Sequence, residues 1–254
     1  MVKSKKKSSS IYQEQPYEEI QESDITEEPE KPQTDDFRAA MPVPNTTTGR
    51  QPLDQATRDA FNNNNLSDVT IYISAKSGQI ELPAHSFVLA ASSTYFKTAL
   101  EGNFTESKSR EFRFHQECPH TYWRVFEYMY TREYSDEPAK NVPFEKDEDE
   151  EELSRDVEVF CLAEYFGVDN LKEYALKRFK SKIQELWVSE RFIDCIRNVF
   201  GSTTKSGGEL LRHAVVLAAK DHLSQLWAKQ AFKDLVREGG DFTEDLLDMK
   251  VASG

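Results

Sequence analysis

Histidine and serine lie close together in the stretch ELPAHSFVLAASSTYF, where they could act in acyl transfer. His85 is followed by Ser86, Ser92 and Ser93. A histidine that takes the proton of a serine hydroxyl needs a third group to orient it, and acyl transfer also needs an oxyanion hole. The glycine pattern of a nucleophile elbow does not surround these serines, and Ser92 or Ser93 is suited to cap a helix. We therefore predict no catalytic residue and a protein that is not an enzyme.

A second cluster of reactive side chains occurs in the segment HQECPH, which contains His115, Cys118 and His120. Imidazole and thiolate groups bind zinc, but a structural zinc site usually has four ligands, arranged as two pairs separated by a hairpin. A fourth ligand is missing nearby, and Cys118 directly precedes Pro119, a residue suited to the first turn of a helix. We therefore predict no metal site, and no cofactor.

The charge and composition of the chain exclude further classes of function. The 254 residues carry a formal net charge of −13, and a surface that binds nucleic acid needs clustered Lys and Arg. No apolar run is long enough to cross a membrane or to serve as a secretory signal. We expect no nucleic-acid, membrane or small-molecule partner. Three widely spaced cysteines, Cys118, Cys161 and Cys195, are expected to be reduced thiols of a cytoplasmic or nuclear protein.

Composition also divides the chain into a polar tail and a folded remainder. Residues 1–52 are rich in Glu, Pro, Ser and Gln and lack a hydrophobic period, so we predict a disordered acidic and polar tail. Within it, Lys5–Lys7 leave two interpretations open, a nuclear import signal or a solvated basic tip. A second acidic stretch, residues 135–152, is predicted to be a solvated loop that does not pack. Because apolar helices follow it, one core is expected to span this loop.

Hydrophobic periods predict the elements of the folded part. Val69, Ile71 and Ile73 alternate with polar residues, as in a half-buried strand, and the turn KSGQ leads into a second strand, IELPAH. A third strand is expected in EFRFHQ. Helical spacing is found in 53–61, 86–91, 92–102, 119–130, 153–161, 171–179, 192–199, 210–215, 223–235 and a last helix with Asp241 and Glu244 as a capping box.

The stretch LSDVTIYIS…GQIELPAHSFVLAASSTYFKTALEGNFTES resembles the opening of the BTB/POZ domain. YMYTREY is similar to the end of that family's third helix, and VFCLAEYFGVDNLKEYALKRF to its closing helix pair. The resemblance covers residues 67 to about 180. It implies an α+β BTB/POZ fold, a small mixed sheet covered by helices. We expect this domain at residues 53–180 and a C-terminal helical extension at residues 181–254.

The resemblance also implies structural positions for Asp68 and His85, which are typical of the fold's interior. The sequence departs from the family pattern at Ser86, where a basic residue is common, and in the acidic insertion at residues 145–152. It lacks a clear extra N-terminal strand of the type that some members exchange between subunits, so a homodimer stays an open question. The organisation looks most like the short single-domain members of filamentous fungi.

Members of this family are interaction modules; many self-associate, and some hold the cullin of a ubiquitin ligase and bring a substrate to it. The cullin-contacting motif is resembled by Phe104-Thr105-Glu106, in which an aromatic anchor could fill a partner's pocket beside a carboxylate. Alternatively, Phe104 packs beneath the loop and Glu106 is solvated. The helices after residue 180 resemble the extension that widens this contact. We expect a substrate adaptor of a cullin-type ligase or, alternatively, a self-associating scaffold or regulator that binds no cullin.

Overall fold

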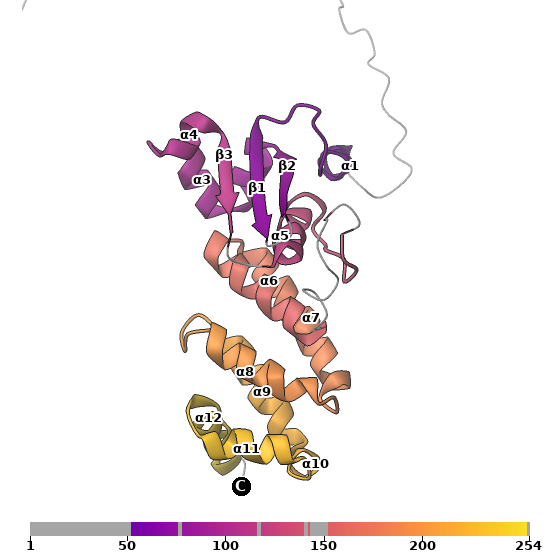
Figure 1. Cartoon of the computed structure of the whole chain (residues 1–254), viewed down its shortest axis with the longest axis vertical. Helices are drawn as coiled ribbons and strands as arrows, with labels where there is room; N and C mark the ends of the chain where they lie inside the picture. The colour runs from indigo at the N-terminus through magenta and orange to yellow at the C-terminus, as the bar shows by residue number, and fades with distance from the viewer. Residues whose placement is uncertain (1–51, 76–77, 116–117, 140–141, 143–151, 253–254) are drawn as a thin grey trace, which may run out of the picture. The chain divides into compact units, whose positions relative to one another are not determined.

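The computed structural model describes residues 52–75, 78–115, 118–139, 142 and 152–252 (Figure 1). The predictions for residues 1–51, including Lys5–Lys7, and for most of the acidic insertion fall outside these ranges. The described part combines a small sheet with many helices, which confirms the predicted α+β class.

A mixed three-stranded sheet has the order β2-β1-β3. Its central strand β1 (Val69–Ala75) pairs antiparallel with β2 (Gly78–Ala84) and parallel with β3 (Glu111–Phe114). The register places Ile71 beside Phe112 and Ile73 beside Phe114, and all four side chains are buried. Alternation of buried and exposed side chains along these strands follows the pleat, so the predicted hairpin and third strand are confirmed.

Two of the helices next to the sheet begin at residues whose chemistry favours a helix start. The Ser93 hydroxyl accepts a hydrogen bond from the Phe96 amide, 3.1 Å away, and donates one to the Phe166 carbonyl at 2.6 Å. Ser93 is therefore the N-cap, and Pro119 opens its helix as expected. The helices next to the sheet are α1 (Pro52–Asp59), α2 (Ser86–Ser92), α3 (Thr94–Glu101), α4 (Thr105–Ser109) and α5 (Pro119–Thr131).

An aromatic cluster joins the sheet to the helices around it. Phe96 of α3 lies 4.9 Å from Phe112 of β3 and 5.0 Å from Phe166, measured between ring centroids. Phe166 ends α6 (Glu152–Phe166), and Gly167, at a left-handed φ of 62°, separates it from α7 (Asp169–Leu186). Gly167 thus divides the two helices expected around residues 153–161 and 171–179, and one buried cluster includes residues on both sides of 143–151, as expected of a single core.

Five helices form the C-terminal part: α8 (Arg191–Ser202), α9 (Glu209–Asp221), α10 (Leu223–Leu226), α11 (Gln230–Glu238) and α12 (Asp241–Val251). α8 packs on α6 and α9 packs on α7, so the extension shares its core with the helices before it. The segment expected as one helix at 223–235 is divided into α10 and α11.

The predicted capping box of the last helix is wrong. Gly240, at a φ of 85°, is the N-cap of α12, and no side-chain hydrogen bond caps this end. Instead, the Asp241 carboxylate accepts a bond from the Arg212 guanidinium at 2.8 Å. Arg212 is buried, with 6% of its surface exposed, so pairing its charge takes precedence over capping.

The expectation that residues 135–152 do not pack is wrong for the described residues at their start. Val142 is buried in the core. The buried Arg124 side chain donates to the backbone carbonyls of Ser135 and Asp136, at 3.0 and 3.3 Å. The acidic composition of this stretch does not indicate these contacts, because they are made by backbone carbonyls and by one apolar residue.

A buried charged centre fixes the same loop to α6 and α7. Asp156, which is fully buried, accepts a hydrogen bond from the Tyr134 hydroxyl at 2.6 Å and lies 3.1 Å from the Lys182 ammonium. Arg178 contacts Asp156 at 3.3 Å and Asp136 at 2.5 Å. Burial, and then the neighbouring Asp156 charge, raises the pKa of Tyr134, so this hydroxyl stays a hydrogen-bond donor.

Candidate functional site

His85 and the serines that follow it are held by structural contacts. One ring nitrogen of His85, Nδ1, lies 3.1 Å from the Tyr130 hydroxyl, and the other, Nε2, lies 2.8 Å from the Asn65 carbonyl. Both ring nitrogens thus face groups other than a serine hydroxyl. This geometry ties the end of β2 to α5 and to the loop before β1.

Asp68 is exposed, so the expectation of an interior position is wrong for this residue. Its carboxylate accepts hydrogen bonds from the Ser86 amide at 2.7 Å and the Ser86 hydroxyl at 2.5 Å. Burial acts to raise the pKa of Asp68, but the two bonds from Ser86 and the Arg110 charge outweigh it and lower the pKa below 3.8. The Asp68 carboxylate therefore accepts the hydrogen bonds of the first residue of α2, although Asp68 itself lies outside the helix, on the protein surface.

His115, Cys118 and His120 do not converge on one point. His120 is buried in α5 with 1% of its surface exposed, whereas His115 is exposed at the end of β3. Within the part of the chain that the structure describes, no group of three or more His, Cys, Asp or Glu side chains is arranged to hold a metal ion.

The Phe104-Thr105-Glu106 motif lies at the start of α4, on the wall of an open groove. The groove has a volume of about 510 Å³ and lies between α3, α4 and the end of α6. Phe104 exposes 53% of its surface, and the Cδ2–Cε2 edge of its ring lies against Gly102, where an added Cβ would come within 2.7 Å of both atoms. The side chain is therefore neither buried beneath the loop nor fully solvated.

Two tyrosines and a carboxylate complete this groove. Tyr95 and Tyr165 line it with their ring centroids 5.4 Å apart, and Tyr165 exposes 61% of its surface. Burial, followed by the proximity of Tyr165 and Glu106, raises the pKa of Tyr95 to about 12. Among the residues that the structure describes, Glu106 forms no ion pair, so its charge is available to a partner. We define Tyr95, Phe104, Glu106 and Tyr165 as the anchor groove.

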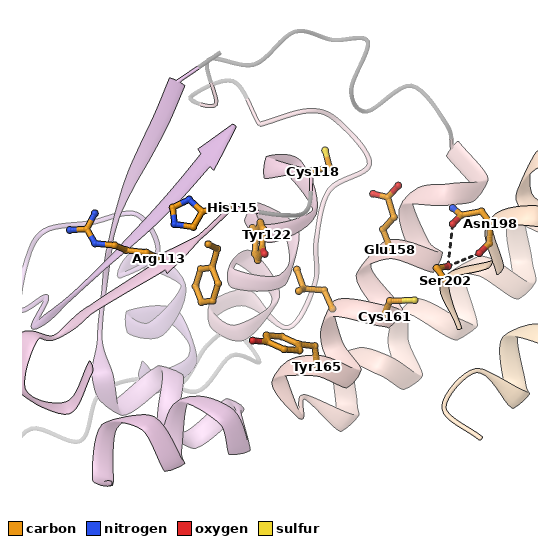
Figure 2. A pocket seen from close by; sticks show the side chains of 11 residues that line it. Arg113, His115, Cys118, Tyr122, Glu158, Cys161, Tyr165, Asn198 and Ser202 are labelled. Carbon is orange, nitrogen blue, oxygen red and sulfur yellow. Dashed lines mark hydrogen bonds between the residues drawn. The ribbon is translucent and has the colours of Figure 1, made fainter. Parts of the chain in front are cut away.

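A second cavity, of about 550 Å³, adjoins the anchor groove, because Tyr165 lines both (Figure 2). Figure 2 shows Arg113 and His115 on the sheet side and Asn198 and Ser202 on the opposite side, where the Ser202 hydroxyl donates to the Asn198 carbonyl at 2.5 Å. The lining comes from β3, α5, α6 and α8, so this cavity lies between the sheet domain and the helical extension.

Sequence reasoning selected Phe104 and Glu106 but missed Tyr95 and Tyr165. Tyr165 falls outside the apolar face expected for residues 153–161. An aromatic side chain that is not needed for that face could have indicated an exposed ring available for binding. Tyr95 gave no such signal, because aromatic residues in a short helix ordinarily pack in the core. Only the tertiary fold brings α3, α4 and α6 together.

No helix in the described ranges is long and apolar enough to cross a membrane. Comparison with known proteins identifies residues 58–182 as matching the BTB/POZ domain family. The chain is also similar to Kelch-like ECH-associated protein 1A of Danio rerio, with 33% identity over 66 residues, or 26% of this chain. That match spans 11% of the relative. The matched family and the mixed sheet with its helices show that residues 58–182 of this chain form a BTB/POZ domain, the domain of a family of protein-interaction modules.

Proposed function

We propose that this protein is a substrate adaptor of a cullin-type ubiquitin ligase and that the anchor groove holds the cullin. The observation that carries the proposal is the exposure of Phe104 and Tyr165 on one open groove beside Glu106, a carboxylate without an ion pair in the described chain. Aromatic anchors supply most of the binding energy of protein interfaces, and a charge at the rim selects the partner.

The position of the helical extension supports this proposal. Tyr165 separates the anchor groove from the cavity that Asn198 and Ser202 of α8 line. A partner that covers Tyr165 would meet both the domain and the extension. A larger contact of this kind is the expected form of a stable complex, because small contacts bury too little surface.

Calorimetric titration of the full chain into the N-terminal domain of a cullin tests the proposal. We expect a Kd in the micromolar range or below, about −8 kcal/mol or better. Phe104→Ala and Glu106→Lys should each weaken binding by about tenfold or more, since each removes a central contact. Leu247→Ala and Glu244→Lys, both at exposed positions of α12, are matched controls that should leave binding unchanged.

Circular dichroism and thermal melting of every variant establish that it is folded. Absence of binding by the folded wild-type chain would exclude the adaptor function. Equal binding by wild type and both anchor-groove variants would mean that a cullin is held elsewhere on the molecule.

A second candidate function, self-association, has its own observation. Leu53 of α1 and Phe87 of α2 expose 69% and 77% of their surfaces and line a shared cavity of about 250 Å³ between α1, α2 and α5. Exposed apolar side chains gathered in one place are typical of a protein interface. We propose a homodimer through this face, as a scaffold that needs no cullin.

Sedimentation of the full chain at increasing concentration separates the two candidates. Self-association predicts a concentration-dependent dimer that Phe87→Glu converts to a monomer and that Tyr165→Glu leaves intact. A monomer at every concentration would remove this second function and leave the cullin titration unaffected.

A further inference from the structure

A groove on the helical part of the molecule shares no lining residue with the anchor groove. It has a volume of about 370 Å³ and lies between α7 and α9. Ile183 and Ala214, both buried, contribute apolar lining, and Leu217, which exposes 38% of its surface, lies on the α9 side. We call this the α7/α9 groove.

Apolar exposure continues from the groove along α9. Leu210 exposes 54% of its surface, and it lies seven residues before Leu217, with the exposed His213 between them. The positions i, i+3 and i+7 share one face of a helix. This face gives the groove an apolar edge about two turns long.

Two exposed lysines lie on the α7 side of the groove, on a chain whose formal net charge is −13. Lys180 lines the groove and Lys177 lies one turn earlier on α7; both are exposed, and neither forms an ion pair with any residue that the structure describes. Asp221 also lines the groove, but the Lys220 ammonium lies 3.8 Å from its carboxylate and offsets its charge.

We propose that the α7/α9 groove binds an acidic amphipathic helix of another protein. The apolar edge fits leucine-like side chains that recur every three or four residues, and the lysines fit carboxylates on the flanks of such a helix. A basic amphipathic helix would meet Lys177 and Lys180 as like charges. Because its lining is separate from the anchor groove, this surface would carry a second partner at the same time as the first.

Fluorescence anisotropy of a labelled designed peptide tests the proposal on the full chain. The probe is an 18-residue helix-forming peptide with leucines on one face and glutamates elsewhere, a length of about five turns. We expect saturable binding that weakens roughly fivefold or more with Lys180→Glu and with Leu217→Glu. Raising the salt from about 50 to 500 mM should also weaken it, because exposed charges are screened.

Matched controls keep the test decisive. Lys250→Glu and Leu247→Glu make the same changes at exposed positions of α12 and should leave binding within about twofold. A peptide with lysines in place of glutamates should bind at least fivefold more weakly than the probe, by the same like-charge argument. No saturable binding of the acidic peptide, equal binding of the lysine peptide, or equal losses in the α12 controls would overturn the proposal. Phe104→Ala should leave binding of the acidic peptide unchanged. A failure of the cullin titration can therefore be told apart from a failure of this proposal.

Discussion

Two clusters of tyrosine and carboxylate in this molecule have opposite surroundings. Around Asp156, which is fully buried, the Tyr134 hydroxyl, Arg178 and Lys182 all approach the carboxylate. In the anchor groove, Glu106 lines the same hollow as Tyr165 and forms no ion pair among the described residues, and Tyr165 exposes 61% of its surface. The first cluster satisfies its charges within the fold, whereas the second leaves them to solvent or to a partner.

One helix connects the two clusters. Asp156 and Tyr165 both belong to α6 and are nine residues apart, which is about 2.5 turns and therefore opposite sides of the helix. The contrast teaches that residue type alone does not assign a function. The number of partners that the fold supplies distinguishes a group that stabilises the protein from a group that is free to bind.

The largest effect is expected at the buried cluster. Asp156→Ala removes the buried carboxylate that pairs with Arg178 and Lys182 and accepts the Tyr134 hydrogen bond, and breaking a buried pair costs about 3–5 kcal/mol. Urea unfolding at pH 7 should show this loss in the free energy of unfolding. The matched variant Asp194→Ala, whose side chain is 66% exposed, should change it by less than about 0.5 kcal/mol. Equal losses in both variants would contradict the structural assignment of the Asp156 cluster.

The next effect should appear in binding and not in stability. Tyr165→Ala removes an exposed ring from the junction of two cavities, so we expect cullin affinity to fall about tenfold while the free energy of unfolding changes by less than about 0.5 kcal/mol. Calorimetry and urea unfolding of the same preparation measure both quantities. A stability loss as large as that of Asp156→Ala would show that the two clusters are not different in kind.

The sequence predicts the local parts of this contrast but not the tertiary ones. Alternation at Val69–Ile73 and the proline at 119 correctly predict a strand and a helix start, because both signals act within a few residues. The anchor groove depends on Tyr165, which is distant in sequence from Phe104. The capping box at Asp241 fails because Arg212, on another helix, binds that carboxylate. Long-range pairing of charges has no local pattern from which it could be predicted.

The smallest effect concerns Asp136, which is intermediate between the two clusters because its side chain is 45% exposed. Burial acts to raise its pKa, but hydrogen bonds and charge from Lys182 and then Arg178 outweigh it and lower the pKa below 3.8. A lowered folded-state pKa gives stability that is present above the unfolded pKa of about 3.9 and is lost as the pH falls through the folded value. Asp136→Asn should therefore reduce stability at pH 7 by less than about 1 kcal/mol, because solvent screens a half-exposed pair.

The decisive measurement for Asp136 is the difference between wild type and Asp136→Asn across pH. Urea unfolding at about pH 7, 5 and 3 should give a difference that is constant between the first two values and smaller at the third, since Asp136 of the unfolded wild-type chain takes up a proton below about pH 3.9 more readily than Asp136 of the folded chain. Asp194→Asn serves as the control, because its carboxylate is more exposed and lies 3.9 Å from Arg197. A difference that grows as the pH falls would mean that Asp136 does not favour its charged form in the folded state. The loop after α5 would then be held by Arg124, by the hydrogen bond from Tyr134 to Asp156 and by the buried Val142.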